Sequence, residues 1–594
     1  MARRRFTTHP LVLRRAEVRR IRDITPRMRR ITLTGAQLGS FEKDGTTHPP
    51  FVSSAFDDHI KLIFAEGDIA PALPVQLPHG IEWTASETRR ARDYTPRNVT
   101  ADGFDLDFVI HDGGVASRWA QEARPGDDLW FVGPKASTQA PEHIDWILLV
   151  ADETGLPAVG RFLDERPIDA PATIVLTISD PTARQELAVR ADDRVEWILA
   201  DPTDGDALVA AVRALGLAER PDVATGYAWC GAESRALLPL RRHLSREVGL
   251  PRERLDITGY WHHEDEHEAP EDPAAAGDDA HPVPVPSPRA WFVVRAALQV
   301  GLVDAVAASP GIALADAATA VGIDAGPLAP LLGDLLTHGI LAGDADGLRL
   351  GPAGEELLAD EHAREVYDGL DSEILASLDG LGDALRSGTS AWSRRTGASF
   401  AAQADGDAEL QEELQEGGEQ LAYLTDGLLA HAVWESASRV LVVGPGSTPV
   451  GLALRGHRAV ADVSIAEPRA GLAAIREDVA GAIPTHPLDA VSAASHEADV
   501  IVLAHALGHR TDAEATELVA RVTGIAPRLL VLEASRPDAL AGASAHTEVR
   551  HLALTGSALR DADAISALAG AHGWRRDEVV PLGWGVEGVL FTAR

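Results

Sequence analysis

At residues 92–97 the chain reads Arg-Asp-Tyr-Thr-Pro-Arg, and this stretch organises the first half of the sequence. Tyr94 offers the apolar face of a ring, and Thr95 offers a short hydroxyl that can donate or accept a hydrogen bond. Arg92 and Arg97 lie on either side of this pair and can bind anionic oxygens through their planar guanidinium groups. We therefore predict that the stretch binds a flat, phosphorylated cofactor.

A glycine pair, Gly113-Gly114, follows farther along the chain. Glycine lets the backbone come close to a ligand because it has no side chain. The amides of Val115, Ala116 and Ser117 would then begin a helix, where free N–H groups bind anions. This second stretch therefore adds a candidate phosphate site to the first.

Motifs in this region resemble those of the siderophore-interacting proteins. They are R-x-Y-T-x-R at residues 92–97, D-F-V-x-H at 107–111, and G-V-A-S-R-W-A at 114–120, with Pro-Gly-Asp at 125–127. That family consists of FAD-binding ferric-siderophore reductases related to the ferredoxin reductases. The resemblance covers about residues 8 to 264.

The resemblance implies that an antiparallel β-barrel holds FAD, with Arg92 and Ser117 at the phosphates. Tyr94 would pack on the isoalloxazine ring and Thr95 would bond near the flavin N5 atom, so these two are the expected catalytic residues. For His111, a turn histidine bonded to backbone is the alternative to a cofactor contact. The remaining FAD contacts expected from the resemblance are Asp93, Arg97, Asp107, Val109, His111, Gly114, Val115 and Ala116.

Length and composition set further bounds. A chain of 594 residues is long enough for about three or four domains. The net charge of -36 argues against a nucleic-acid partner, although a general bias toward acidic residues explains the charge as well. A single cysteine, Cys230, excludes a disulfide framework and a cysteine-rich metal site, and we expect no metal site. No apolar run of about 18 residues and no secretory signal is evident, so we expect a cytoplasmic protein.

The first 264 residues read as two domains. Short strand patterns divided by glycine and proline predict a small antiparallel barrel at residues 8–138, with its arginines between 3 and 30 on the solvated side. Apolar runs that alternate with helical stretches predict a parallel sheet at residues 139–264. Ligands of such sheets bind beyond the carboxyl ends of the strands, where Asp152 to Gly155 and Gly231 to Glu233 lie.

In the resembled family this second domain binds NAD(P)H. The contacts expected from the resemblance are Asp152, Thr154, Gly155, Gly231, Ala232, Glu233 and Trp261. Lys61 and His262 are the expected substrate residues, because family members use cations to hold an anionic ferric chelate. The family usually has arginine or lysine where this chain has His262, and a solvated lysine is the alternative for Lys61.

Residues 265–288 read as an acidic, proline-rich linker. The stretch from Glu264 to Asp279 has eight acids and no lysine or arginine, and prolines alternate through residues 282–288. Such a composition is extended and buries little surface. We therefore predict that the linker divides the chain into two independent halves.

The second half resembles the class I SAM-dependent O-methyltransferases. Helical patterns and a short hairpin at 341–350 are similar to that family's winged-helix dimerisation domain, which we place at residues 289–355. Leading helices and a Rossmann-like methyltransferase domain follow at residues 356–594. The resemblance places Gly444 and Gly446 in a glycine-rich turn that binds SAM, and Glu467 at the ribose hydroxyls.

The second half also departs from the methyltransferase pattern. Val442 replaces an acid before the glycine turn, and Pro445 and Thr448 stand where glycines are usual. Gly508 falls at the place of the catalytic base, and His509 and His505, one and three residues away, are the alternatives for that role. Without a positioned base, deprotonation of a hydroxyl is slowed by about 10²–10⁴-fold. We expect a degenerate module for dimerisation or partner contact, with SAM as a further candidate ligand. The alternative is a bifunctional protein whose C-terminal half methylates a small hydroxylated metabolite.

The sequence and its two resemblances therefore predict a multidomain α/β protein with a β-barrel. The expected function is flavin-dependent reduction of a ferric siderophore, with release of iron as Fe(II). The expected cofactors are FAD and NADH or NADPH, and ferredoxin stays open as an electron donor. We expect no nucleic-acid or membrane partner, and a homodimer formed through the C-terminal half.

Overall fold

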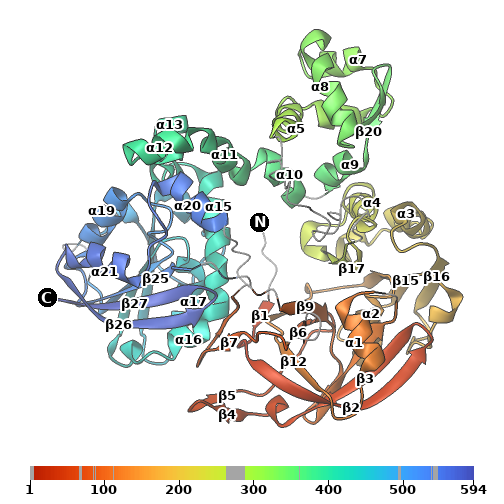
Figure 1. The fold of residues 1–594 in the computed structure, drawn as a ribbon, viewed down its shortest axis with the longest axis horizontal. Coiled ribbons are helices and arrows are strands. Elements are labelled where there is room, and N and C mark those ends of the chain that lie inside the picture. Colours follow the sequence, from red (N-terminus) through yellow and green to blue (C-terminus); the bar gives the residue numbers. More distant parts are fainter. Residues whose placement is uncertain are drawn as a thin grey trace, which may run out of the picture. The chain divides into compact units, whose positions relative to one another are not determined.

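The computed structural model describes residues 6–65, 70–84, 86, 88–111, 113–262, 288–359, 361–492, 497–536, 538 and 546–594. The chain forms two compact units, whose elements are labelled in Figure 1. One unit comprises residues 1–24, 28–139 and 374–594, and the other comprises residues 25–27 and 140–373. The predicted linker lies outside the described residues, apart from Pro288.

The first unit begins with a seven-stranded sheet in the order β10-β11-β3-β2-β12-β6-β9. Only Thr95 and Pro96 separate β9 from β10, and three peptide steps reach about 11 Å at most. Because β9 and β10 are the two edges of the sheet, the sheet curls until its edges meet at this dipeptide. The predicted antiparallel barrel is therefore present, and we call it the barrel domain. Its strands are β2 Leu13–Thr25, β3 Met28–Thr34, β6 Ile60–Ala65, β9 Arg89–Tyr94, β10 Arg97–Thr100, β11 Gly103–Val109 and β12 Asp128–Val132.

Alternate strand residues fill the interior of the barrel, as the two-residue period of a strand requires. Leu106 and Phe108 of β11 and Leu62 of β6 belong to this core. Helix α1, Val115–Glu122, covers one end through Ala116 and Ala120. Shorter elements of the domain are β1 Phe6–Thr8, which pairs with β13 Ala136–Thr138, and the hairpins of β4 Phe41–Lys43 with β5 Thr46–His48 and of β7 Val75–Gln76 with β8 Ile81–Glu82.

The second unit contains the predicted parallel sheet, with strands in the order β16-β15-β14-β17-β18. All four strand pairings are parallel. The chain builds outward from β14 to one side and then crosses to β17, so the strand order reverses between β14 and β17. The elements are β14 Trp146–Ala151, α2 Leu156–Glu165, β15 Ala172–Ile178, β16 Arg194–Leu199, α3 Gly205–Arg213, β17 Gly226–Glu233, α4 Leu237–Arg242 and β18 Leu255–Trp261.

A helical region completes the second unit. Gly301, which has a φ of 77°, separates α5 from α6. Among the described residues, none of the helices alone could cross a membrane, although α5 and α6, which meet at 60°, reach the required length and apolarity together. The elements are α5 Arg289–Gln299, α6 Leu302–Ala308, α7 Leu314–Ala320, α8 Ala325–Thr337, β19 Leu341–Asp344, β20 Gly347–Leu350, α9 Pro352–Ala359 and α10 Glu361–Asp368.

The C-terminal domain is a seven-stranded sheet in the order β23-β22-β21-β24-β25-β27-β26. Its strands pair in parallel up to β25, and β27 is antiparallel to both of its neighbours. This is the methyltransferase-like fold that the resemblance implies. The strands are β21 Arg439–Val443, β22 Asp462–Glu467, β23 Thr485–Pro487, β24 Val500–Ala504, β25 Arg528–Ala534, β26 Trp574–Gly583 and β27 Val586–Ala593.

Helices surround this sheet, and its strands supply two cores by alternation. Leu441 and Val443 face one core, whereas Val440 and Val442 face the other. The helices are α11 Leu370–Ser377, α12 Leu381–Ser387, α13 Ala391–Thr396, α14 Phe400–Ala404, α15 Ala408–Gly418, α16 Thr425–Leu429, α17 Ser447–Arg455, α18 Arg469–Ala474, α19 Asp512–Val522, α20 His546–Thr555 and α21 Ala562–Gly570.

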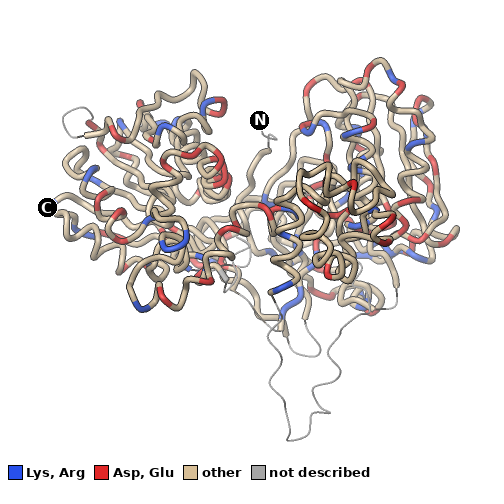
Figure 2. The backbone as a smooth tube through the Cα atoms, turned by 90° about the horizontal axis from the view of Figure 1, so that it is seen from above, with Lys and Arg blue, Asp and Glu red and all other residues tan. Residues whose placement is uncertain are grey.

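The second of these cores continues into the barrel domain. It includes Trp434 and Trp584 of the C-terminal domain together with Leu13, Ile63 and Ile81 of the barrel. The prediction of two independent halves is therefore wrong, because apolar side chains from both halves are buried in one cluster. Acidic and basic positions of the described residues are unevenly distributed along the chain (Figure 2), and residues 396–438 contain nine Asp or Glu and no Lys or Arg.

Candidate functional site

Tyr94 and Thr95 lie where the barrel closes. Tyr94 is the last residue of β9, and its ring lies 4.5 Å from the ring of Phe108, measured between centroids. The Tyr94 side chain is half-buried, whereas Thr95 is buried. Burial raises the pKa of the Tyr94 phenol, so the phenol is neutral near pH 7. The ring is therefore partly exposed and not sealed inside a core.

Arg92, Asp93 and Lys61 lie on the outer surface beside Tyr94. Arg92 is exposed, and its guanidinium donates to the carbonyl of Ala91 over 2.8 Å. Lys61 Nζ contacts both carboxylate oxygens of Asp93, at 2.8 and 2.9 Å. Arg92 is thus available to an incoming anion, whereas the charge of Lys61 is already paired within the protein.

Asp107 holds the other side of the closure. Its carboxylate is buried and accepts from Arg30 at 2.6 and 2.7 Å and from Arg97 at 3.1 Å. Arg97 is itself buried at the start of β10. Arg97 therefore fixes β10 against β11, and Val109 ends the same β11 strand. The expectation that the arginines between 3 and 30 lie on the solvated side is wrong for Arg14 and Arg30, whose side chains are largely buried. Arg97, expected to bind anionic oxygens of the cofactor, pairs with Asp107 instead.

The glycine pair forms the expected turn before α1. Gly113 and Gly114 have φ angles of 108° and 74°, which favour glycine, and a Cβ on Gly113 would meet nothing within 4 Å. The Ser117 hydroxyl donates to the carbonyl of His111 and accepts from its N–H, at 2.9 and 3.1 Å. The first-turn amides of Val115 and Ala116 have no intrahelical acceptor. The turn thus fits an anionic group that bonds to backbone, while Ser117 holds the turn in shape.

Together these residues fit a flat ligand with phosphates. They provide a half-buried ring, an exposed guanidinium and an open glycine turn within one domain. Among the described residues, no group of three or more His, Cys, Asp and Glu side chains is placed to hold a metal ion.

Asp152 joins three strand ends in the second unit. One of its carboxylate oxygens accepts from the N–H and hydroxyl of Thr154, at 2.7 and 2.5 Å, and from the N–H of Gly155 at 3.3 Å. The other accepts from the N–H of Glu233 at 3.0 Å and from the indole of Trp261 at 2.7 Å. Burial raises the pKa of Asp152. The predicted residues of β14, β17 and β18 therefore meet where the strand order reverses.

The backbone at this point is close-packed. A Cβ on Gly155 would lie 2.1 Å from the carbonyl oxygen of Gly231, so only glycine fits there. Ala232 is buried in β17, and Glu233 accepts from the N–H of Ala236 over 2.8 Å. His262 is exposed, and its Nδ1 lies 3.6 Å from Glu233 Oε1. The edge beyond β14 and β17 is the place where sheets of this kind bind nucleotides.

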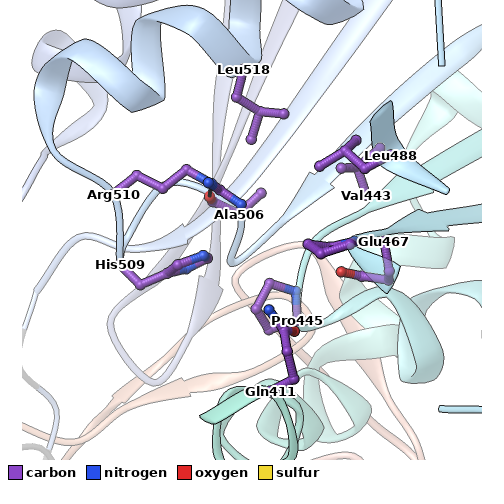
Figure 3. A pocket seen from close by; sticks show the side chains of 11 residues that line it. Gln411, Val443, Pro445, Glu467, Leu488, Ala506, His509, Arg510 and Leu518 are labelled. Carbon is purple, nitrogen blue, oxygen red and sulfur yellow. Dashed lines mark hydrogen bonds between the residues drawn. The ribbon is translucent and has the colours of Figure 1, made fainter. Parts of the chain in front are cut away.

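A small pocket lies at the corresponding reversal of the C-terminal sheet, between β21 and β24. Glu467 ends β22, and its Oε1 accepts from the Ser447 hydroxyl over 2.7 Å. Burial raises the pKa of Glu467 to about 7. The cavity volume is about 10 Å³, room for roughly one water molecule and far below the roughly 300–1,000 Å³ of ordinary ligand sites. The lining, drawn in Figure 3, includes Gln411, Gly444, Pro445, Glu467, His509 and Arg510.

The glycine turn of this pocket is tightly packed. Gly444 has a φ of 107°, and a Cβ there would lie 2.6 Å from the Ala504 carbonyl oxygen. At Gly446 a Cβ would lie 2.4 Å from a methyl carbon of Leu421. Gly444 is therefore required by contacts within the protein itself, whereas at Gly446 the nearest obstacle is the movable end of the Leu421 side chain.

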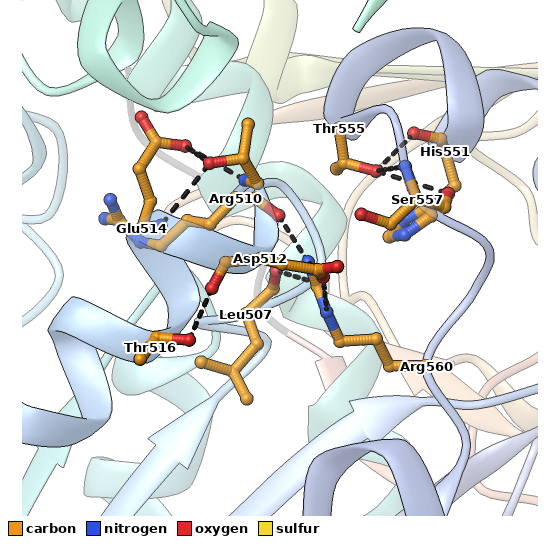
Figure 4. A network of polar contacts seen from close by, with 10 residues as sticks. Leu507, Arg510, Asp512, Glu514, Thr516, His551, Thr555, Ser557 and Arg560 are labelled. Atoms are coloured by element: carbon orange, nitrogen blue, oxygen red, sulfur yellow. Dashed lines mark hydrogen bonds and ion pairs between the residues drawn. The ribbon is translucent and has the colours of Figure 1, made fainter. Parts of the chain in front are cut away.

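The loop after β24 is held by a polar network (Figure 4). Arg560 donates to the carbonyls of Leu507 and Arg510, each at 2.8 Å, and forms an ion pair with Asp512 at 2.7 Å. Gly508, at the expected base position, offers no proton acceptor. The Glu533 carboxylate lies 3.1 Å from where a Cβ of Gly508 would be, and burial raises its pKa to about 7.

Comparisons with known proteins cover the first part of the chain. A family model described as siderophore-interacting FAD-binding domain matches residues 17–138, and one described as siderophore-interacting protein matches residues 144–264. The NADPH-dependent ferric-chelate reductase of Escherichia coli K12 is 32% identical over 256 residues, which are 42% of this chain and 94% of that protein. The chain belongs to the siderophore-interacting protein family.

Two solved structures are similar to parts of this siderophore-interacting protein. A siderophore utilization protein from T. fusca is 36% identical and covers 44% of this chain and 96% of its own, with a TM-score of 0.39. The O-methyltransferase NcsB1 from neocarzinostatin biosynthesis, solved with S-adenosyl-L-homocysteine and 1,4-dihydroxy-2-naphthoic acid, is 24% identical. It covers 51% of this chain and 96% of its own, with a TM-score of 0.40.

Sequence reasoning missed several residues of these sites in the siderophore-interacting protein. Arg30 is the bidentate partner of Asp107, although its arginine-rich strand reads as solvated. Glu533 could have been found, because it is an acid near the end of a strand, the same signal that indicates Glu467. Arg560 carries no such signal, since its partners at 507–512 are about fifty residues away.

Proposed function

We propose that the protein is a flavin-dependent ferric-siderophore reductase, with FAD bound by the barrel domain and Fe(III) in a siderophore as the substrate. The observation that carries this proposal is the half-buried Tyr94 ring beside the barrel closure, in the same domain as the open turn at Gly113. Membership of the siderophore-interacting family and the activity named for the Escherichia coli relative support it.

Each predicted residue has a distinct role in this proposal. When bound, FAD would accept two electrons as a hydride from the nicotinamide and pass them one at a time to Fe(III). Tyr94 and Thr95 orient its ring, and Arg92 with the amides of Val115 and Ala116 binds its phosphates. Arg97 and Asp107 fix the closure, and Ser117 shapes the turn rather than contacting phosphate directly. None of these side chains needs to transfer a proton.

We assign the parallel-sheet domain to the nicotinamide donor. The predicted residues at the ends of β14, β17 and β18 are joined through Asp152 at the reversal of strand order, where dinucleotides bind in open sheets. NADPH is the first candidate because the Escherichia coli relative is named for it. NADH and ferredoxin are the other donors to test.

We assign His262 and Lys61 to the anionic siderophore complex. His262 is exposed at the end of the strand that carries Trp261. Lys61 would have to exchange Asp93 for the ligand, which makes its contribution the smaller one. The cytoplasm is the proposed compartment, since NAD(P)H is found there.

We propose that the C-terminal domain transfers no methyl group. Gly508 stands at the base position, and the pocket beside Glu467 is smaller than ordinary ligand sites. The helices α5 to α8 with the β19–β20 hairpin are assigned to a winged-helix dimerisation region, which would make the protein a homodimer. Calorimetry with SAM tests whether the pocket binds this ligand at all, and an assay with a hydroxylated acceptor tests the assignment: transfer of the methyl group from SAM to the acceptor would contradict it.

An anaerobic spectral titration tests the reductase itself. The purified protein should be yellow, or become so with added FAD, and should bleach when NADPH or NADH is added. A ferric chelate added afterwards should restore the oxidised spectrum and produce Fe(II), which a ferrous-specific chelator detects. A protein that stays colourless after FAD is added would rule out the proposed function.

A further inference from the structure

A short arm of the barrel domain, residues 79–83, lies directly against the C-terminal domain. A Cβ on Gly80 would lie 2.3 Å from the carbonyl oxygen of Leu582, so the two backbones are in contact. The N–H of Trp584 donates to the carbonyl of Ile81 at 3.2 Å. The N–H of Trp83 donates to the Asp538 carboxylate at 2.8 Å. These hydrogen bonds take the place of the bonds to water that the backbone groups of Ile81, Trp83 and Trp584 would otherwise make.

The arm is also an apolar anchor. Ile81 and Trp83 are 0% and 6% exposed, and they share a buried cluster with Leu582 and Trp584, each 4% exposed. Burial of four large apolar side chains removes them from water and stabilises the contact between the two domains. The contact is thus part of a hydrophobic core rather than a surface touch.

Polar and aromatic contacts extend the interface at its rim. The Tyr423 ring stacks on Trp584 at 4.9 Å and on Phe6 of the barrel at 5.8 Å, measured between centroids. Lys135 Nζ lies 5.3 Å from the centroid of Tyr423, and Glu82 forms an ion pair with Arg536. Both domains therefore contribute charge and aromatic surface to one continuous contact.

This core lies behind the strands that carry the candidate flavin site. On β6, Leu62 points into the barrel core and Ile63 into the shared core. On β9, Tyr94 packs against the barrel core, and Ala91 packs against the shared core. The strand that ends at Tyr94 therefore lies between the barrel core and the shared core, to which the C-terminal domain contributes.

We propose that the methyltransferase-like domain is a permanent structural partner of the barrel within the same chain, and that tight retention of FAD depends on it. The second clause rests on the proposed function, whereas the first does not. The domain would hold β6 and β9 in place from behind, so that the Tyr94 ring keeps its position.

A pair of glycine variants in the full-length protein tests this proposal. Gly80→Ala adds a methyl group that only the Leu582–Gly583 backbone opposes, whereas at Gly39→Ala the nearest atom is 3.7 Å away. We expect Gly80→Ala to lower the melting temperature by about 5 °C and to weaken FAD binding by about tenfold. It should also speed proteolysis between the two domains, and Gly39→Ala should match the wild type.

A charge exchange provides a second test that leaves the backbone intact. Glu82→Arg should weaken FAD binding, and adding Arg536→Glu should restore at least half of the loss. Equal FAD affinity in Gly80→Ala, Gly39→Ala and wild type would overturn the dependence of FAD on the domain. Equal melting temperature and proteolysis in the cofactor-free proteins would overturn the structural partnership. The cofactor-free measurements hold even if the protein binds no flavin, so the two failures are distinguishable.

Discussion

At the scale of single residues, the barrel closure depends on one buried carboxylate. The Asp107 side chain is 0% exposed, and those of Arg97 and Arg30 are 8% and 11% exposed. Two guanidiniums share this carboxylate, and Arg30 has a second, more distant acid in Asp105 at 4.0 Å. Arg97, which follows the Tyr94-Thr95-Pro96 segment, is thus held in place by its ion pair with Asp107 as well as by packing.

Asp107→Asn should destabilise the protein strongly, because it leaves two buried cations without a full counter-charge. We expect the free energy of unfolding to fall by about 3 kcal/mol, the low end for a broken buried pair, since Asp105 offsets part of the loss. Urea unfolding measures the change. Asp93→Asn is the matched control, because its ion pair with Lys61 is exposed and should matter by less than about 1 kcal/mol. Equal effects in the two variants would contradict this account.

At the scale of elements, the turn between β14 and α2 shows how close packing makes a site. Gly155 has no room for a Cβ because the Gly231 carbonyl stands 2.1 Å away. The turn therefore sits directly on the end of β17, and the two strand ends cannot move apart without breaking the bonds to Asp152.

Gly155→Ala should separate these strand ends and weaken binding of the nicotinamide donor. We expect KM for NADPH to rise by about tenfold or more, with FAD content unchanged because FAD is assigned to the other domain. Steady-state kinetics and the flavin spectrum measure both quantities. The control is Gly333→Ala in α8, where a Cβ would meet nothing within 4 Å. An unchanged KM for NADPH in Gly155→Ala would show that the nicotinamide donor does not bind at this edge of the sheet.

The end of β25 gives a prediction about pH. Burial raises the pKa of Glu533 from 4.5 to about 7, so the folded protein keeps a proton there that the unfolded chain loses. The stability that this proton contributes is complete below about pH 4.5 and is lost as the pH rises to about 7. Relative to Glu533→Gln, the wild type should lose up to about 3 kcal/mol over this range.

Urea midpoints at pH 5, 6 and 7.5 measure this difference. The buried histidines His505 and His551, whose pKa values are lowered to about 4 by burial, shift stability in the opposite direction but occur in both proteins. Their effect therefore cancels in the comparison. A difference that does not change with pH would show that Glu533 is ionised in the folded state.

At the scale of the whole molecule, the domains do not follow the order of the chain. The barrel and the C-terminal domain form one compact unit, while the segment between them forms the other. Removal of residues 374–594 should expose Ile81, Trp83 and Ile63, so the truncated chain should aggregate or unfold at a lower temperature. Sedimentation and thermal unfolding measure this. A truncated protein that is monomeric and reduces flavin normally would mean that the halves are independent after all.

The sequence by itself determined the local chemistry. Residues 92–97 contain the Tyr94 ring, the Thr95 hydroxyl and the Thr95-Pro96 dipeptide at which the barrel closes. In β11 and β21 the two-residue period of a strand assigns alternate side chains to opposite faces of the sheet. These features depend only on neighbours a few residues apart. Family membership and the positions of Asp152, Gly155, Gly444 and Glu467 at strand ends follow from the same short-range patterns.

Only the tertiary structure decided which faces meet. The bond from Trp83 to Asp538 and the pair of Glu82 with Arg536 join residues more than 400 positions apart. Arg30 meets Asp107 because β3 and β11 lie side by side in the sheet, which the chain order does not show. Apolar periodicity says that a face must be covered but not by what, since many partners bury the same area. The sequence therefore could not predict that the two domains share one core, although the residues of that core are apolar and were expected to be buried.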